Sequence, residues 1–167
     1  MEGGRRTLRS SHIFDPERNY DAHRPDPPLD RYGPARDQGI TAEIAHWAEQ
    51  QTIVRGLLTV YILHTSASLL IQENASPAVR HDLDAFLRRI VPEDMSLYRH
   101  NDEGPDDMPA HIKSALTQTQ LTIPVIDGRL QLGVWQGIFL FEHRATPHRR
   151  SLVLSLIGEE AASPGSG

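Results

Sequence analysis

The chain has 167 residues and a formal net charge of −5. This length fits one domain that can bury a core, and an acidic chain lacks the basic surface to which nucleic acids and anionic membranes bind. It contains no cysteine, which excludes disulfides, thiolate metal sites and a cysteine nucleophile. No apolar stretch is long enough to span a membrane. We therefore expect a cytoplasmic protein that binds small molecules or associates with itself.

Composition divides the chain into three parts. Residues 1–38 are rich in Arg, Asp and Pro and hold too few apolar residues to bury a face, so we expect an irregular N-terminal arm. Residues 161–167 are small and polar and are predicted to form a flexible tail. Residues 39–160 are then the folded domain.

Apolar periodicity predicts a helix, two strands and a second helix in the first half of this domain. The first helix covers Ile40–Gln50. A nearly unbroken apolar run over Gly56–His64 predicts a strand buried on both faces, and Ala67–Glu73 predicts another strand. The second helix begins at Pro77 and ends before Pro92. Its apolar stripe comprises Val79, Leu83, Phe86, Leu87 and Ile90.

A long polar segment follows this helix. Glu93–Met108 contains Gly104 and Pro105 and reads as a loop, and loops of this length in a compact domain are often functional. A third helix should start near Asp107. Its expected inward face is Ile112, Ala115 and Leu116.

Strands dominate the remainder. Leu121–Ile126, the turn Asp127–Gly128 and the alternating Leu130–Val134 predict a hairpin. Trp135–Phe141 and Ser151–Ile157 predict two further strands. The expected class is α+β: a mostly antiparallel two-sheet β-sandwich with two or three helices.

Nine histidines are the natural candidates for metal binding or proton transfer in a chain without thiols. Five lie in the arm or among charged neighbours and are expected to be solvated: His12, His23, His46, His81 and His148. His64 ends a predicted strand, His100 lies in the long loop and His111 opens the third helix. These three could converge on one ion, or each could be a partly buried histidine bonded to a backbone carbonyl.

The residues after His64 offer a second type of chemistry. Thr65 and Ser66 carry hydroxyls where freed backbone N–H groups could meet a ligand oxygen. A Ser-His-Asp hydrolase would pair Ser66 or Ser68 with His64 and a carboxylate such as Glu142, but the chain has no GxSxG elbow. A Walker loop and a GxGxxG sequence are also absent, which argues against nucleotide-binding folds.

Three longer blocks carry a family resemblance. HTSASLLIQENASP (His64 to Pro77), YRHNDEGPDDMPAHIK (Tyr98 to Lys113) and IPVIDGRLQLGVWQGIFL (Ile123 to Leu140) resemble, in order and separation, the signature blocks of the YjbQ-like family, UPF0047. The resemblance covers about Ile40 to Glu159.

This resemblance implies a β-sandwich with helices, assembled as a homotrimer, with a pocket at or near subunit contacts. It implies His64, His100 and His111 as ligands of a divalent metal, zinc-like or magnesium, or of an anion. The other implied site residues are Thr65, Ser66, Glu73, Asn74 and Gln136 for substrate binding and His64, His111 and Glu142 for catalysis.

The implied activity is that of a secondary thiamine phosphate synthase, in which a thiazole phosphate nitrogen displaces diphosphate from a pyrimidine methylene carbon. The substrates would be small phosphorylated metabolites, and a non-catalytic trimer that binds a metal or metabolite is the alternative. Three positions depart from the family pattern: Val134 replaces a usual Thr, Gln120 a usual Ser and Ser76 a common Asp. The Ser76 change preserves helix capping.

Overall fold

The computed structural model describes the backbone of residues 7–14, 37–146 and 148–161, with side chains described from residue 39 onward within these ranges. The strands are β1 (Thr7–Phe14), β2 (Asp37–Gly39), β3 (Ile53–Ile62), β4 (Ala67–Glu73), β5 (Gln120–Ile126), β6 (Arg129–Leu130), β7 (Gln136–Glu142) and β8 (Leu152–Glu160). The helices are α1 (Thr41–Glu49), α2 (Pro77–Ile90) and α3 (Asp107–Leu116), with a single 3₁₀ turn, η2 (Met95–Leu97), between the last two.

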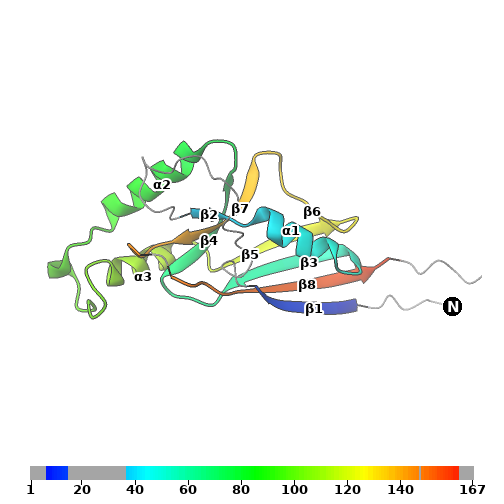
Figure 1. The fold of residues 1–167 in the computed structure, drawn as a ribbon, viewed down its shortest axis with the longest axis horizontal. Coiled ribbons are helices and arrows are strands. Elements are labelled where there is room, and N and C mark those ends of the chain that lie inside the picture. The colour runs from blue at the N-terminus through cyan, green and yellow to red at the C-terminus, as the bar shows by residue number, and fades with distance from the viewer. Residues whose placement is uncertain (1–6, 15–36, 147, 162–167) are drawn as a thin grey trace, which may run out of the picture.

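The strands form two antiparallel sheets (Figure 1). One has the order β1-β8-β3-β5-β6 and the other β2-β7-β4. The predicted class, an α+β two-sheet antiparallel sandwich with helices, is therefore confirmed. None of the helices in the described ranges is long and apolar enough to cross a membrane.

The core lies between the two sheets and is closed on one side by α1. It is built from alternate residues of the facing strands, because successive side chains of a strand point to opposite faces. The buried members are Ile40, Ile44, Ile53, Leu58, Val60, Ile62, Ala67, Leu69, Leu121, Ile123, Val125, Ile138, Leu140, Leu152, Leu154 and Leu156.

The two outer faces of the sandwich differ. Helices α2 and α3 contact β4 of the three-stranded sheet, and the Arg80 guanidinium of α2 lies 4.5 Å from the centre of the Phe139 ring of β7. The other outer face, on the five-stranded sheet, leaves Leu57, Tyr61 and Ile157 exposed. The prediction that the β3 strand is buried on both faces is wrong for the single chain, because the described elements cover only its inner face.

The N-terminal segment contains a strand that its composition did not indicate. Thr7–Phe14 pairs with β8 over eight residues, from Thr7 opposite Glu159 to Phe14 opposite Leu152. The expectation of an irregular arm is wrong for this stretch. Its position is set by backbone hydrogen bonds to β8, a strand that is distant in sequence. Residues 15–36 and the predicted flexible tail after residue 161 lie outside the described residues.

Several local predictions are confirmed. α2 begins at Pro77, where proline suits the first helical turn because it lacks an N–H. Asp127 and Gly128 both have positive φ, 52° and 72°, as a type I′ hairpin turn requires. The strand after this turn is short, because β6 contains only Arg129 and Leu130.

Candidate metal-binding site

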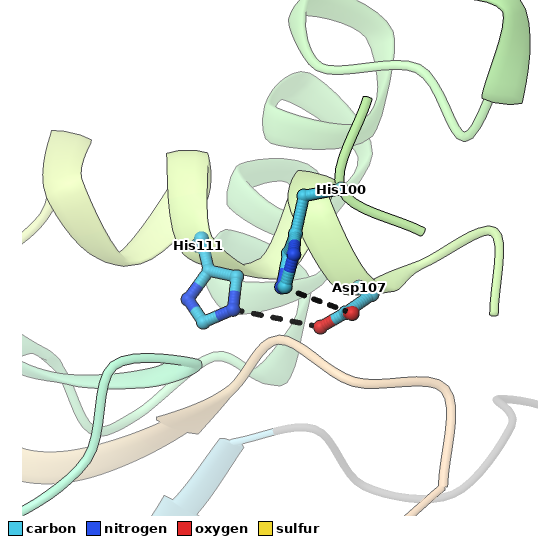
Figure 2. Close-up of side chains that lie close together, drawn as sticks. All are labelled: His100, Asp107 and His111. Carbon is cyan, nitrogen blue, oxygen red and sulfur yellow. Dashed lines mark ion pairs between the residues drawn. The ribbon is translucent and has the colours of Figure 1, made fainter. Parts of the chain in front are cut away.

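The end of the long loop and the start of α3 bring three ligand-type side chains together (Figure 2). His100 lies in the loop, Asp107 is the first residue of α3 and His111 follows it by four positions. Residues four apart on a helix share one face, so Asp107 and His111 point to the same side, and His100 meets them from the loop. The sequence pattern thus builds the cluster from a rigid element and an adjoining loop.

The ligand atoms of this cluster lie within 4.8 Å of one another. His100 Nε2 is 3.2 Å from Asp107 Oδ2, and His111 Nε2 is 3.5 Å from Asp107 Oδ1. The Asp107 side chain is only 2% exposed, whereas His100 is half exposed. The cluster therefore has a buried carboxylate at its base and an imidazole at its mouth.

The tautomer of His111 follows from its second hydrogen bond. Its Nδ1 lies 3.0 Å from the carbonyl oxygen of Thr65, which can only accept, so Nδ1 carries the proton. In the neutral ring Nε2 then presents a lone pair to the Asp107 carboxylate. Two electron-rich atoms face each other at 3.5 Å, an arrangement that a proton or a cation between them stabilises.

An excess of negative charge surrounds the cluster. The Arg144 guanidinium is paired with Glu103, Asp106 and Asp107, which leaves two carboxylate charges uncompensated by Arg144. Burial favours protonation of Asp106, but hydrogen bonds from Ala145 N and Arg144 outweigh it and hold the pKa of that carboxyl below its ordinary value. Asp106 thus stays ionised, and the excess of carboxylates around the cluster favours a cation.

His64, predicted as the third ligand, lies outside this group. Its Nε2 accepts a hydrogen bond of 2.7 Å from Ser151 N, and burial together with nearby Arg150 lowers the pKa of its imidazole. The structure brings His100 and His111 together as predicted, and the third ligand-type side chain beside them is Asp107 rather than His64.

Glu142, the last residue of β7, is held in an ion pair with Arg150. Both of its oxygens accept from Arg150, and one also accepts from Arg144 N at 3.0 Å. Arg150 in turn donates to the carbonyl of Ser66 at 3.3 Å. Burial raises the pKa of Glu142, but these bonds outweigh it, so the net shift is downward. Its contacts are those of a residue that braces the turn.

The remaining predicted substrate-binding residues lie elsewhere. Glu73 pairs with Gln136 at one end of the β4–β7 ladder, whereas Ala67 pairs with Glu142 at the other. Seven strand residues separate these ends by roughly 20 Å. Within one chain, Glu73, Asn74 and Gln136 are therefore too far from Thr65 and Ser66 to line the same site.

Asn74 and Gln136 build a loop at that far end. Asn74 Nδ2 donates to the carbonyls of Val134 and Gln136, and Gln136 Oε1 accepts from Gly133 N at 2.8 Å. An open pocket of about 430 Å³ lies beside the loop. It is lined by Ile71, Gln72, Glu73, Trp135 and Gln136.

The hydrogen bonds of the serines do not support the hydrolase alternative. Ser68 is hydrogen-bonded to His143 at 2.8 Å rather than to His64, and both partners are buried. His143 Nδ1 has no hydrogen-bond partner among the described residues, so an orienting carboxylate is missing.

Two important residues escaped the sequence interpretation. Asp107 enters the sequence interpretation only as the expected start of the third helix, although its four-residue spacing from His111 on that helix is a usable signal. Arg144 carries no such signal, because its partners precede it by about forty residues.

Comparisons with known proteins agree with this fold. Residues 35–159 match the family described as UPF0047 protein YjbQ-like. A UPF0047 protein of Synechocystis is 59% identical over 120 residues, which cover 72% of this chain and 82% of that protein. The UPF0047 protein YjbQ of Escherichia coli O157:H7 is 46% identical over 121 residues, covering 72% and 87%.

Solved structures show the same architecture. A YbjQ-like protein of unknown function from Sulfolobus solfataricus superposes with a TM-score of 0.71 at 18% identity, covering 93% of this chain and 100% of that one. An uncharacterized YjbQ/UPF0047 protein of Clostridium acetobutylicum gives 0.66 at 26% identity, covering 88% and 98%. The residues matched by the family include strands β2 to β7, most of β8 and the loop that carries the site, and this chain belongs to the UPF0047 YjbQ-like family.

Proposed function

We propose that the chain binds a zinc-like divalent metal ion through His100, Asp107 and His111. The observation that carries this proposal is the lone pair of His111 Nε2 that faces the Asp107 carboxylate at 3.5 Å, inside an acidic surrounding. An ion with bonds of about 2.0–2.2 Å in tetrahedral geometry places its ligand atoms roughly 3.3–3.5 Å apart. His100 Nε2 and His111 Nε2 lie 3.2 and 3.5 Å from the two different oxygens of the Asp107 carboxylate, and with one ligand atom taken from each residue all three lie within 4.8 Å of one another.

The ligand types favour zinc-like ions over magnesium. Imidazole is a borderline ligand that suits zinc and other late transition metals, whereas magnesium takes oxygen ligands and retains water. Three protein ligands leave at least one coordination position open, as in catalytic zinc sites. The half-exposed ring of His100 places that position at the surface, within reach of a small molecule.

The reaction proposed for this site is thiamine phosphate synthesis, as the family resemblance implies. In that reaction a C–N bond forms between the thiazole nitrogen and the pyrimidine methylene carbon, and the C–O bond to diphosphate breaks. The departing diphosphate gains charge, which a cation at the site would neutralise. His111 and Asp107 would hold that cation, and Thr65 would keep His111 in the required tautomer.

The same geometry also suits a non-catalytic site that holds a metal or a phosphorylated metabolite. Turnover separates the two functions, because both require the metal ligands. Purified protein should therefore be given the pyrimidine diphosphate and the thiazole phosphate, and product should be measured against buffer. A rate no faster than buffer rejects the synthase and leaves the binding function.

Metal content tests the binding step directly. Protein purified without an affinity tag should contain about one zinc-like ion per chain by elemental analysis, because the described residues form one such ligand cluster. His111→Ala should lose it, while His81→Ala, an exposed histidine on α2, should retain it. Wild-type protein that binds no ion after incubation with zinc or cobalt would reject the proposal.

We also propose that the chain assembles as a homotrimer. Two exposed apolar patches support this: a sheet patch of Leu57, Tyr61, Ile126 and Ile157, and a helix patch of Phe86, Ile90, Met95 and Leu97. Leu57 is 52% exposed and Phe86 47%. Two different patches on one chain suit head-to-tail contacts, which close into a ring.

A further inference from the structure

Arg144 reaches from the end of β7 to the segment that carries the proposed metal ligands. It is only 7% exposed. Its Nη1 donates to Glu103 Oε2 at 2.7 Å and to Asp107 Oδ1 at 3.3 Å, and its Nε donates to Asp106 Oδ2 at 3.2 Å. Its Nη2 donates to the carbonyl of Glu103 at 3.0 Å. One guanidinium therefore ties the loop and the first turn of α3 to the larger fold.

Both oxygens of the Asp107 carboxylate are fixed by this network. Oδ1 accepts from Arg144, and Oδ2 accepts from Glu103 N at 3.3 Å. The Glu103 backbone is itself held by Arg144, through its carbonyl. The same contacts hold the loop three residues after His100, so they bear on two of the three ligands.

We propose that Arg144 is a positioning residue for the metal site: it sets the rotation of the Asp107 carboxylate and docks the loop that delivers His100. This inference rests on the proposed metal-binding function. Arg144 makes no contact with His100 or His111 among the bonds described, and it acts on the ion through Asp107 and the loop. Partners of metal ligands commonly change metal affinity by about 10- to 100-fold.

Charge and positioning predict opposite outcomes when Arg144 is changed. A positive charge beside a ligand oxygen repels a bound cation, so an effect of charge alone would make Arg144→Gln bind metal more tightly. Positioning predicts weaker binding instead. Arg144→Lys keeps the charge but cannot reproduce a planar fork with several fixed donors, so positioning predicts weaker binding there as well.

The test is a cobalt titration of metal-free protein, followed through the visible absorption of Co²⁺ with a competing chelator. Arg144→Lys and Arg144→Gln should each bind about 10- to 100-fold more weakly, with an altered cobalt spectrum. Arg88→Gln is the control. It removes an arginine on α2 that pairs with Asp84 and has no described contact with the three ligands or with the Thr65–Ser66 turn, so its cobalt affinity should equal that of the wild type.

Each result decides the inference. Equal affinity of Arg144→Lys and wild type, or tighter binding by Arg144→Gln, overturns the positioning role and leaves the metal site intact. No cobalt binding by wild type overturns both proposals. If the Arg144 variants do not fold, Glu103→Gln provides the test, because that side chain is 70% exposed and reaches Arg144. Its affinity loss should persist at high salt, where exposed charges are screened; a loss that salt abolishes overturns the inference.

Discussion

The Nε2 atom of His143 lies 2.8 Å from the Ser68 hydroxyl, within the layer between α3 and the β4–β7 ladder. His143 is 1% exposed, and its ring packs 4.8 Å from that of Phe141. Burial and the nearby Lys113 charge lower the pKa of His143 to about 4 from an ordinary 6.5. The imidazole is therefore neutral in the folded protein at neutral pH.

His143 should make the protein less stable as the pH falls. The unfolded chain takes up a proton near pH 6.5, whereas the folded chain resists it until about pH 4, so the unfolded state binds more protons in this window. The free energy of unfolding should decrease by roughly 1.5 kcal/mol between pH 6.5 and about pH 5 from this residue alone. Urea unfolding at several pH values, with chelator present, measures the loss.

The control is His143→Gln, which keeps a polar partner for Ser68 but does not titrate. This variant should be less stable at neutral pH, because the imidazole packing is lost. Its stability should change less than that of the wild type over the same pH window. An identical pH dependence in both proteins would show that His143 is not the titrating group.

Removal of Glu142 should destabilise the fold. The Arg150 side chain is 5% exposed, and Glu142→Gln would leave its buried charge without an anionic partner. Breaking a buried pair from one side costs about 3–5 kcal/mol. Thermal unfolding should detect this loss. The double variant Glu142→Gln, Arg150→Met removes the uncompensated charge and should recover part of it; no recovery would contradict the ion-pair explanation.

Bound metal should decrease as the medium becomes acidic. Only neutral imidazole binds a metal ion, so protons compete for His100 and His111. Dialysis of zinc-loaded protein at a series of pH values from 8 to about 5, followed by elemental analysis, should show the ion leaving across the imidazole range. Metal content that does not change over this range would exclude both rings as ligands.

The homotrimer should appear as a mass near three chains in light scattering at dilute concentration. Phe86→Glu places a charge in the helix patch and should shift the mass toward that of one chain, because a charged side chain resists burial in an interface. His81→Glu, which lies on α2 outside the patch, should remain assembled. A wild-type protein that is a clean monomer would end the proposal.

Local patterns predicted most of the fold. Helix α1 and helix α2 were expected from their apolar spacing, and α2 also from Pro77 at its first position, although Ser76 makes no side-chain capping hydrogen bond there. Ala67–Glu73 was expected as a strand with its observed bounds. Strand β1 was not expected, because Thr7–Phe14 has weak alternation and pairs with β8, about 145 residues later. Pairing at such a distance leaves no trace in a single sequence.

The third helix shows why burial patterns can mislead. Its inward face was predicted to be Ile112, Ala115 and Leu116, but Leu116 is exposed, whereas Lys113 and Ser114 are buried. Ser114 Oγ donates to the carbonyl of Ala67, so α3 packs through polar contacts onto β4. The spacing of apolar residues cannot predict the buried face of a helix that packs through polar side chains.

The site was predicted in part. His100 and His111 were chosen because they lie at the ends of elements, and the structure places them side by side, with ring centres 5.3 Å apart. His64 was chosen for the same reason, but the backbone N–H of Ser151 occupies its ring nitrogen. The outcome depended on a contact between residues almost ninety positions apart.

In the proposed site the ligands are divided between α3 and the loop, so metal affinity would depend on local unfolding of the loop. Asp107 and His111 share one turn of α3, whereas His100 would reach the ion only while the loop is docked. Each tenfold reduction in the docked fraction weakens the apparent affinity tenfold. A bound metal ion should in turn slow amide hydrogen exchange in residues 98–106, because it would favour the docked state of this loop.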